Sequence, residues 1–473
     1  MMRRFPLLIL CAGIATFSNE VRGQTLKPRP NVAAPKPFTA PKVIERTYGN
    51  GMRVALIPFT ATSTARIELV IRAGTADESA DQPTVAQMVG QLLLEGTRSL
   101  SADSIARLVS DLGAVGGSVS INTSSNETTL GVDVLPDGAP RMIELLADLV
   151  RHPSFSQPAF DRAKSNTIRG IQSQRSQADW LGSSRTNSLL FPRNPLDRVP
   201  GENEIQSLTL ASIARFHRDY YAPNRSRLYV AGTFDRANVE RAATQAFAPW
   251  ERSSTRPFVL PKNSPRAENA ASDRPIIHII DRPGATQARV QVSFPVVDQP
   301  HPDHRVLNEI NMLMGSAQTA RIVANIRERH GYSYNIHTSL VRRPGSTQWI
   351  VVGDITNNVV APALREILGE ISRLRAEAPP LEELKGFQSF MAGILISENS
   401  TARGILESLK WMDLYGVSAT YFGRIIPDLY AVTPGNIKQI AARYLTPARM
   451  VVVIVGDRKA IAQQLEEIGP VVE

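Results

Sequence analysis

The chain of 473 residues has little cysteine, few aromatic residues and no long hydrophobic run. Cys11 is the only cysteine, which excludes a disulfide framework within one chain. No stretch reaches the 18 consecutive apolar residues typical of a transmembrane helix. Aromatic residues make up only 6% of the chain, and the basic residues are scattered despite a formal charge of +9. A dedicated nucleic-acid-binding surface is therefore not indicated.

The N-terminus is typical of an export signal. Residues 1–4 are a basic start, residues 7–15 form a short apolar stretch, and small residues precede Gln24, the expected first residue of the mature protein. Leu10 stands where a lipid-attachment signal needs a small residue before Cys11. We therefore predict a signal peptide at residues 1–23, a proline-rich linker at residues 24–42, and a soluble periplasmic or secreted protein without disulfides.

The sequence contains an internal repeat. Thr, Ile, Tyr, Pro and Gly occur at offsets 0, 4, 11, 14 and 23 from Thr209, and again at the same offsets from Thr433. The two copies are separated by 224 residues, and each ends in a β-rich run that stops at Gly232 or Gly456. A five-point match at fixed offsets indicates two homologous halves. The segment 251–272, rich in Ser, Pro, Arg and Asn, is predicted to link them.

Hydrophobic periodicity predicts the same order of elements in both halves, with strands in adjacent pairs separated by helices. In the first half we expect strands at residues 53–57, 65–71, 117–123 and 128–135 and helices at 84–94, 101–112 and 141–150; in the second, strands at 275–280, 289–294 and 349–353 and helices at 305–313 and 361–374. This pattern favours an α+β fold with mostly antiparallel sheets. The expected domains are residues 43–250 and 273–473.

One motif frame in the first half identifies a family resemblance. A strand ends in Arg72, Ala73, Gly74 and Thr75, and the following helix carries Gln87 to Gln91, an apolar run, and then Gly96 and Thr97. This frame resembles the zinc-site helix of the pitrilysin/insulinase-type metallopeptidases, which carries His-x-x-Glu-His. In this register Gln87 and Gln91 stand at the zinc-ligand positions and Gly90 stands at the catalytic glutamate.

These replacements remove the zinc chemistry that the resemblance implies. Zinc is bound by imidazole, thiolate or carboxylate groups, and an amide oxygen is a poorer ligand. Gly90 has no side chain that could act as a base on a metal-bound water. The family takes a third ligand, a glutamate, about 75 residues downstream, and residues 166–170 contain no carboxylate. We therefore expect no metal bound by this chain.

The second half retains a motif that the resemblance connects with catalysis. Arg327 and Tyr334 stand seven residues apart with Gly331 between them, as in the family segment Leu-Arg-x-x-x-Gly-x-x-Tyr. In the family this pair lies opposite the zinc, binds the substrate backbone and stabilises the oxyanion. Guanidinium and phenol groups are donors suited to developing negative charge. The alternative is an ordinary surface arginine and a half-buried tyrosine.

Together these features predict a zinc-less subunit. The resemblance implies a fold of two halves closing like a clam shell around a peptide-sized chamber, and one branch of the family pairs a zinc-bearing chain with a chain that lacks the motif. We expect such a heterodimeric, exported peptidase, with Arg327 and Tyr334 acting on a peptide at the partner's zinc. The strand 117–123 would offer an edge for the peptide, and the alternative is an ordinary strand paired on both sides. The chain alone is expected to be inactive.

Two other function classes remain open. The first is a non-catalytic peptide-binding or scaffold protein of the same fold. The second is an autonomous hydrolase with a rebuilt metal site at His301 and His304, which flank Pro302 and Asp303. The proline and the polar neighbours place this cluster in a loop, which favours a chance grouping of side chains.

Overall fold

The computed structural model describes residues 41–473, except for 60–61, 193–199, 253, 255–257, 261–273, 300, 344, 346 and 419. The predicted export signal (1–23) and nearly all of the predicted linker at 24–42 lie outside the described residues. Of the predicted linker at 251–272, residues 251–252, 254 and 258–260 are described and form no helix or strand. The described residues belong to one compact unit.

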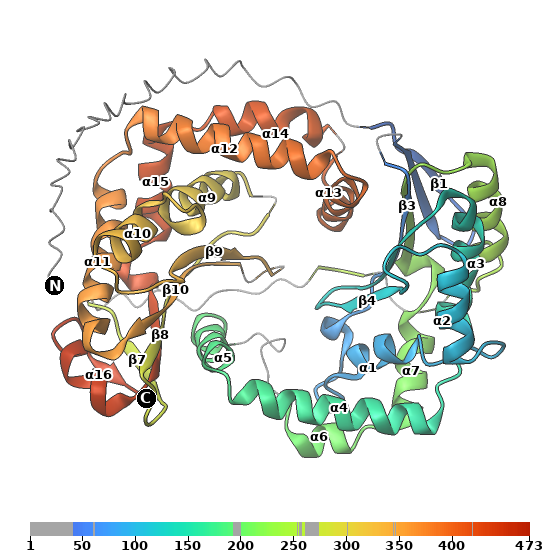
Figure 1. Cartoon of the computed structure of the whole chain (residues 1–473), viewed down its shortest axis with the longest axis horizontal. Coiled ribbons are helices and arrows are strands. Elements are labelled where there is room, and N and C mark those ends of the chain that lie inside the picture. The colour runs from blue at the N-terminus through green and yellow to red at the C-terminus, as the bar shows by residue number, and fades with distance from the viewer. Residues whose placement is uncertain are drawn as a thin grey trace, which may run out of the picture. The chain divides into compact units, whose positions relative to one another are not determined.

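The first half consists of a six-stranded sheet with helices packed on it (Figure 1). Its elements are β1 (Ile44–Thr47), β2 (Arg53–Pro58), β3 (Ala65–Ile71), η1 (Thr75–Asp77), α1 (Val85–Leu92), α2 (Ala102–Asp111), β4 (Ser120–Thr123), β5 (Thr128–Val134), η2 (Pro136–Gly138), α3 (Ala139–Arg151), α4 (Gln157–Arg175), α5 (Ala178–Leu190), α6 (Glu202–Gln206), α7 (Leu210–Tyr220), η4 (Pro223–Arg225), β6 (Ser226–Gly232) and α8 (Arg236–Phe247).

The second half contains a second six-stranded sheet. Its elements are β7 (Ile277–Asp281), β8 (Gln287–Pro295), α9 (Asp303–Asn311), η5 (Met312–Ser316), α10 (Arg321–Val323), η6 (Ala324–Arg329), β9 (His337–Val341), β10 (Gln348–Thr356), η7 (Asn357–Val359), α11 (Val360–Ala376), α12 (Leu381–Asn399), α13 (Ala402–Tyr415), α14 (Tyr421–Tyr430), α15 (Pro434–Tyr444), η8 (Pro447–Arg449), β11 (Val451–Gly456), α16 (Arg458–Leu465) and β12 (Val471–Val472).

Five strands of each sheet share one topology, whereas the sixth is the N-terminal β1 in the first sheet and the C-terminal β12 in the second. Their strand orders are β1-β2-β6-β3-β5-β4 and β12-β7-β11-β8-β10-β9. Neighbouring strands run antiparallel except in the pairs β2–β6, β7–β11 and β7–β12. The predicted α+β fold of two halves with mostly antiparallel sheets is confirmed.

The sequence repeat forms the same helix, turn and strand in both halves. Thr209 caps α7 by accepting a hydrogen bond from the Ser212 amide, and Thr433 caps α15 by accepting one from the Asn436 amide, both at 3.2 Å. Each helix is followed by a short turn that begins at the repeated proline and then by β6 or β11. Both strands lie inside their sheets, so the repeat marks the centre of each half.

Each half contributes a helix to the other half's sheet. Apolar residues of α13, including Ile405, Leu406 and Leu409, join Tyr229 and other residues of the first sheet in one buried cluster. In the opposite direction, α5 packs on β8 and β11. Its contacts are partly polar, since the Thr186 hydroxyl donates to Gln291 at 3.0 Å. Burying one large aliphatic side chain stabilises a fold by about 1.5–3 kcal/mol and a hydrogen bond by about 1 kcal/mol, so both helices help to hold the two halves together.

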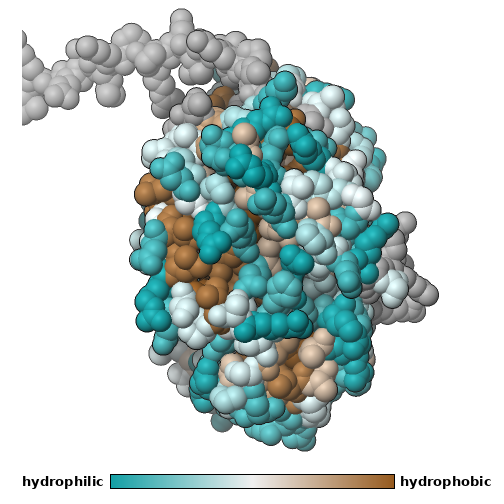
Figure 2. All heavy atoms as spheres, turned by 90° about the vertical axis from the view of Figure 1, so that its right-hand side faces the viewer, coloured by the Kyte–Doolittle hydropathy of each residue, from teal (hydrophilic) through white to brown (hydrophobic). Residues whose placement is uncertain are grey.

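Among the described residues, no helix combines the length and the apolarity needed to cross a bilayer. The face seen in Figure 2 is mostly hydrophilic, with smaller hydrophobic patches between the polar residues.

Candidate functional site

The helix α1 carries the three positions that the family resemblance assigned to the zinc site. Gln87 and Gln91 are exposed, and because they are four residues apart they share one helix face. Gly90 is buried on the side of α1 that faces the strand β4. A Cβ atom at Gly90 would lie 2.5 Å from the Thr123 Oγ1 atom of β4, well inside van der Waals contact. The absence of a side chain at this position therefore allows the helix to lie close to β4.

A half-buried glutamate fixes the start of α1. The Glu78 carboxylate accepts hydrogen bonds from the backbone amides of Thr84 and Ala86, both at 2.9 Å. Burial raises the pKa of Glu78 to about 7, although these two hydrogen bonds oppose the rise. Thr84 has a φ of 67°, a conformation that costs a threonine free energy and persists only where the surroundings enforce it. Glu78 provides that constraint at the start of α1.

The strand β4 lies at the edge of the first sheet. It pairs with β5 on one side, and the strand order ends with it, as the sequence predicted. The strand begins at Ser120 and not at residue 117, because Gly116 and Gly117 both have positive φ and form a turn. An edge strand presents unpaired backbone amides and carbonyls to which an extended peptide can be added.

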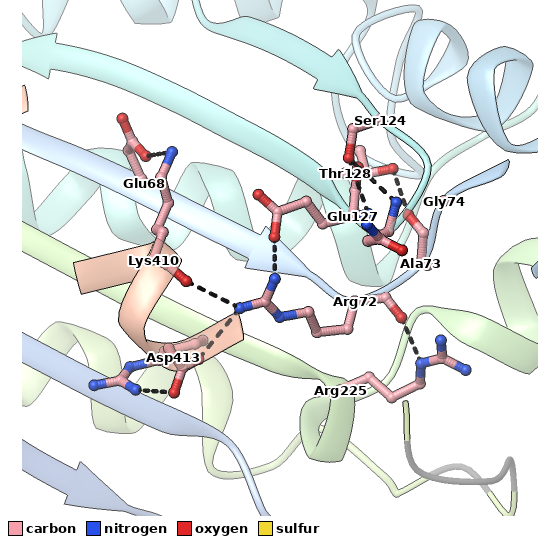
Figure 3. Close-up of polar contacts among 12 residues, drawn as sticks. Glu68, Arg72, Ala73, Gly74, Ser124, Glu127, Thr128, Arg225, Lys410 and Asp413 are labelled. Carbon is pink, nitrogen blue, oxygen red and sulfur yellow. Dashed lines mark hydrogen bonds and ion pairs between the residues drawn. The ribbon is translucent and has the colours of Figure 1, made fainter. Parts of the chain in front are cut away.

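The loop after β3 is tied to the hairpin between β4 and β5 (Figure 3). The amide of Thr75 donates to the Ser124 carbonyl at 3.1 Å, and the Thr128 hydroxyl donates to the Ala73 carbonyl at 2.9 Å. A Cβ atom at Gly74 would lie 2.4 Å from the same Ser124 carbonyl oxygen, so only glycine allows this approach. The Arg-x-Gly-Thr motif therefore holds the hairpin that carries the edge strand.

Arg72 of this motif lies at the centre of an ion-pair cluster (Figure 3). Its guanidinium pairs with Glu127 at the start of β5, and it also contacts Asp413 and the Lys410 carbonyl of α13, both at 3.4 Å. Its own carbonyl accepts a hydrogen bond from the Arg225 Nε at 2.6 Å. One side chain thus connects the hairpin of the first half to a helix of the second half.

Asp413 is the most highly connected acid of this cluster. It forms ion pairs with Arg53 and Arg227 at 2.5 Å and with Arg72. Burial alone would raise the pKa of Asp413, yet the three guanidinium charges hold it below its usual value. Next to it, Lys410 pairs with the buried Glu68 at 2.7 Å. Sequence reasoning missed this cluster because its members come from both halves and share no sequence spacing.

The segment at 166–170 lies on α4, which packs against α1. Asn166, Arg169 and Gly170 are exposed, and Thr167 and Ile168 are half-buried. These residues offer no carboxylate toward a metal. With two amides on α1 and a glycine at the position of the base, the side chains present do not fit a catalytic zinc ion. No group of three His, Cys, Asp or Glu side chains suited to a metal occurs in the described part of the chain.

The structure brings Arg327 and Tyr334 together. Arg327 lies in the π-helical turn η6, and Gly331, with a φ of 64°, reverses the chain after it. The Arg327 guanidinium carbon is 4.5 Å from the centre of the Tyr334 ring, a cation–π distance. Tyr334 is 81% exposed, so its hydroxyl is open to a ligand. The half-buried Arg327 guanidinium also donates to the Gln318 side chain at 3.3 Å and pairs with the exposed Glu328 at 3.2 Å. A ligand would therefore compete with these two contacts for the Arg327 donors.

The two histidines at 301 and 304 have separate surroundings. The prediction of a loop was wrong for His304, because α9 begins at Asp303 and the helix buries the His304 side chain. Its Nδ1 lies 3.0 Å from the Val297 carbonyl, and burial lowers its pKa. The His301 Nδ1 instead accepts a hydrogen bond from the Asp303 amide at 3.1 Å. The His304 Nε2 faces the Arg342 guanidinium at 3.5 Å, and no group of three His, Cys, Asp or Glu side chains suited to a metal includes this pair in the described residues.

Two family models match the chain. Residues 53–196 match the family described as insulinase (peptidase family M16), and residues 207–389 match the peptidase M16 inactive domain. An uncharacterized zinc protease of Mycobacterium bovis is 21% identical over 451 residues, which cover 93% of this chain and 99% of that protein.

Two further proteins resemble the chain. A probable mitochondrial-processing peptidase subunit beta of Arabidopsis thaliana is 24% identical over 282 residues. This match spans 59% of the chain and only 51% of that protein. Among solved structures, a protease from Helicobacter pylori superposes with a TM-score of 0.81 at 16% identity, covering 88% of this chain and all of that one.

Proposed function

Because the chain belongs to the pitrilysin/insulinase family of peptidases, we propose that it is the zinc-less subunit of an exported heterodimeric metallopeptidase. In this proposal a homologous partner chain holds the zinc ion and the general base. This chain contributes peptide binding through the edge strand β4 and donor groups from Arg327 and Tyr334. The location would be periplasmic or secreted, as the N-terminal sequence predicts.

One contrast within the chain carries the proposal. The first half has glutamines at both metal-ligand positions and a buried glycine at the base position, while the second half keeps an exposed tyrosine in contact with an arginine. A family member that had lost all activity would have no requirement for this exposed pair. A guanidinium and a phenol hydroxyl can both donate to a developing oxyanion. The relative described as a subunit of a processing peptidase supports a role within an assembly.

The proposal is tested by isolating the protein from its native source under mild conditions and identifying co-purifying proteins by mass spectrometry. We expect an equimolar exported partner of similar size that carries His-x-x-Glu-His. In the reconstituted pair, Arg327→Ala or Tyr334→Phe should lower kcat/KM for peptide cleavage by about 100-fold, since one oxyanion donor contributes about 100- to 1000-fold. The zinc content of the partner should not change.

Two matched controls separate this role from a general surface effect. Arg329→Ala removes an exposed arginine from the same turn, and Tyr430→Phe removes a hydroxyl from another exposed tyrosine. Both should leave kcat/KM unchanged. Recovery of the chain without a partner, or equal losses in the controls, would overturn the heterodimer. The protein would then be read as a non-catalytic peptide-binding or scaffold protein, the second candidate, which the open edge of β4 favours.

A further inference from the structure

The second half contains a pocket that the proposed function does not use. Its volume is about 610 Å³, and it is bounded by α9, η5, β9, α12, α13 and α14. Cavities of about 300–1000 Å³ hold small-molecule ligands in proteins. The aliphatic side chains on its walls are those of Met312, Leu340, Met391, Ile394, Leu395, Ile425 and Leu429. These side chains match an apolar body of moderate size.

A buried carboxyl group forms one wall of this pocket. Glu309 is 1% exposed, and its Oε2 accepts a hydrogen bond from Gln388 at 3.0 Å. The other oxygen, Oε1, has no hydrogen-bond donor among the described residues. Burial raises the pKa of Glu309 to about 8, although the Gln388 hydrogen bond and the Arg305 charge oppose the rise. A buried polar atom without a partner costs about 1–3 kcal/mol, which a donor group on a ligand would recover.

Aromatic rings and charges around the pocket favour a positive ligand. The rings of Trp411 and Tyr421, both in the lining, lie 4.9 Å apart and offer π faces. Among the described lining residues are four carboxyl groups and only two guanidinium groups. They are Glu309 of α9, Glu398 of α12, Glu407 of α13 and Asp428 of α14, with Arg305 of α9 and Arg342 after β9.

Both guanidinium groups of the lining already have polar partners other than Glu309, so the Glu309 carboxyl group remains for a ligand. The Arg305 guanidinium pairs with Asp428 at 3.5 Å, and Arg342 donates to the Asn308 side chain at 2.6 Å. Glu407 pairs with Lys410. We propose that this pocket binds an apolar cation, an amine on an aliphatic or aromatic body, whose ammonium group pairs with Glu309. The source of that amine is either a free small molecule or a basic side chain of a peptide.

The proposal makes binding dependent on pH. At neutral pH most Glu309 carboxyl groups are protonated, because the pKa is about 8. An ammonium ion favours the carboxylate, so binding releases a proton. The affinity for an amine that stays charged should therefore increase about tenfold for each unit by which the pH is raised, up to pH 8. The other charged groups of the lining are Arg305, Arg342, Glu398, Glu407 and Asp428. Burial lowers the pKa of the Arg342 guanidinium.

The test is calorimetric titration of the full chain with three probes of one shape. They are 4-phenylbutylamine, the uncharged butylbenzene and the anionic 4-phenylbutanoate. We expect the amine to bind at least tenfold more tightly than either control, to release close to one proton at pH 7, and to bind about tenfold more weakly at pH 6. In Glu309→Gln, which keeps the size and the hydrogen bond to Gln388, the amine should lose this preference.

A matched variant and a competition complete the experiment. Glu144→Gln, on the exposed face of α3, should bind the amine like the wild type. Displacement of the amine by an acetylated, amidated lysine peptide would assign the site to a peptide side chain, and failure to displace it would assign it to a free amine. Absence of binding, equal binding of all three probes, or an unchanged preference in a folded Glu309→Gln variant would overturn the proposal. The test needs no partner subunit, so it is independent of the peptidase proposal.

Discussion

Gly90 offers the sharpest test of how the helix α1 packs on the edge strand β4. In Gly90→Ala the new methyl group would lie 2.5 Å from Thr123 Oγ1, with Ile121 and Thr128 methyl groups at 3.5 and 3.7 Å. Only the first contact is too short. To relieve it, Thr123 must rotate and lose its 3.1 Å hydrogen bond to the Thr128 hydroxyl, or β4 must move.

The expected change in the free energy of unfolding is the sum of opposing effects. Replacing a helical glycine with alanine stabilises a helix by about 1 kcal/mol. Forcing an extra methyl group into a packed site costs about 1–3 kcal/mol, and the lost hydrogen bond costs about 1 kcal/mol. Gly90→Ala should therefore destabilise the protein by about 1–3 kcal/mol. In the Thr123→Ala background the short contact is absent, so the same change should stabilise it by about 1 kcal/mol.

The assay is chemical denaturation of the four proteins of this double-mutant cycle, with hydrogen exchange of the α1 amides as a local measure. The matched control is Gly170→Ala, a helical position on α4 where an added Cβ atom meets nothing within 4 Å. It should stabilise the protein. A stabilising Gly90→Ala in the wild-type background, or the same effect with and without Thr123, would refute the packing argument.

Three further predictions follow from buried or replaced groups. Glu309→Gln should make the protein more stable than the wild type at high pH, because the pKa of Glu309 in the folded state, about 8, exceeds the usual 4.5. The wild type should lose up to about 5 kcal/mol of stability as the pH rises from 4.5 through 8. Denaturation midpoints that stay constant for both proteins across this range would contradict the prediction. Asp413→Asn leaves three arginines without their shared acid and should cost about 3–5 kcal/mol in denaturation, whereas Glu144→Gln, which breaks an exposed pair, should cost under about 1 kcal/mol. Gln87→His with Gln91→His restores two zinc ligands on one helix face, and titration should detect zinc binding only in the double variant; stoichiometric zinc in the wild type would contradict the ligand argument.

The sequence predicted the elements of the fold that have local signals. The β-rich runs that end at Gly232 and Gly456 form the strands β6 and β11, as the repeat predicted. The capped helices α7 and α15 within the same repeat are a finding of the structure. The long helices α4, α12 and α13 escaped prediction because their apolar residues do not form one stripe. On α13, apolar residues face the first sheet while Lys410 and Asp413 reach the ion-pair cluster beside it.

The candidate site, like the fold, was predicted from the sequence only in part. The losses at Gln87, Gly90 and Gln91 were legible from the sequence because the family motif fixes their spacing. The packing reason for a glycine at position 90 could not be read from the sequence. Thr123 lies more than thirty residues away in the chain and contacts Gly90 only in the folded protein. This contact also constrains any return of the zinc chemistry. The Cβ atom of a glutamate at position 90 would lie 2.5 Å from Thr123 Oγ1, so placing a base there requires a change in the edge strand as well as in the helix.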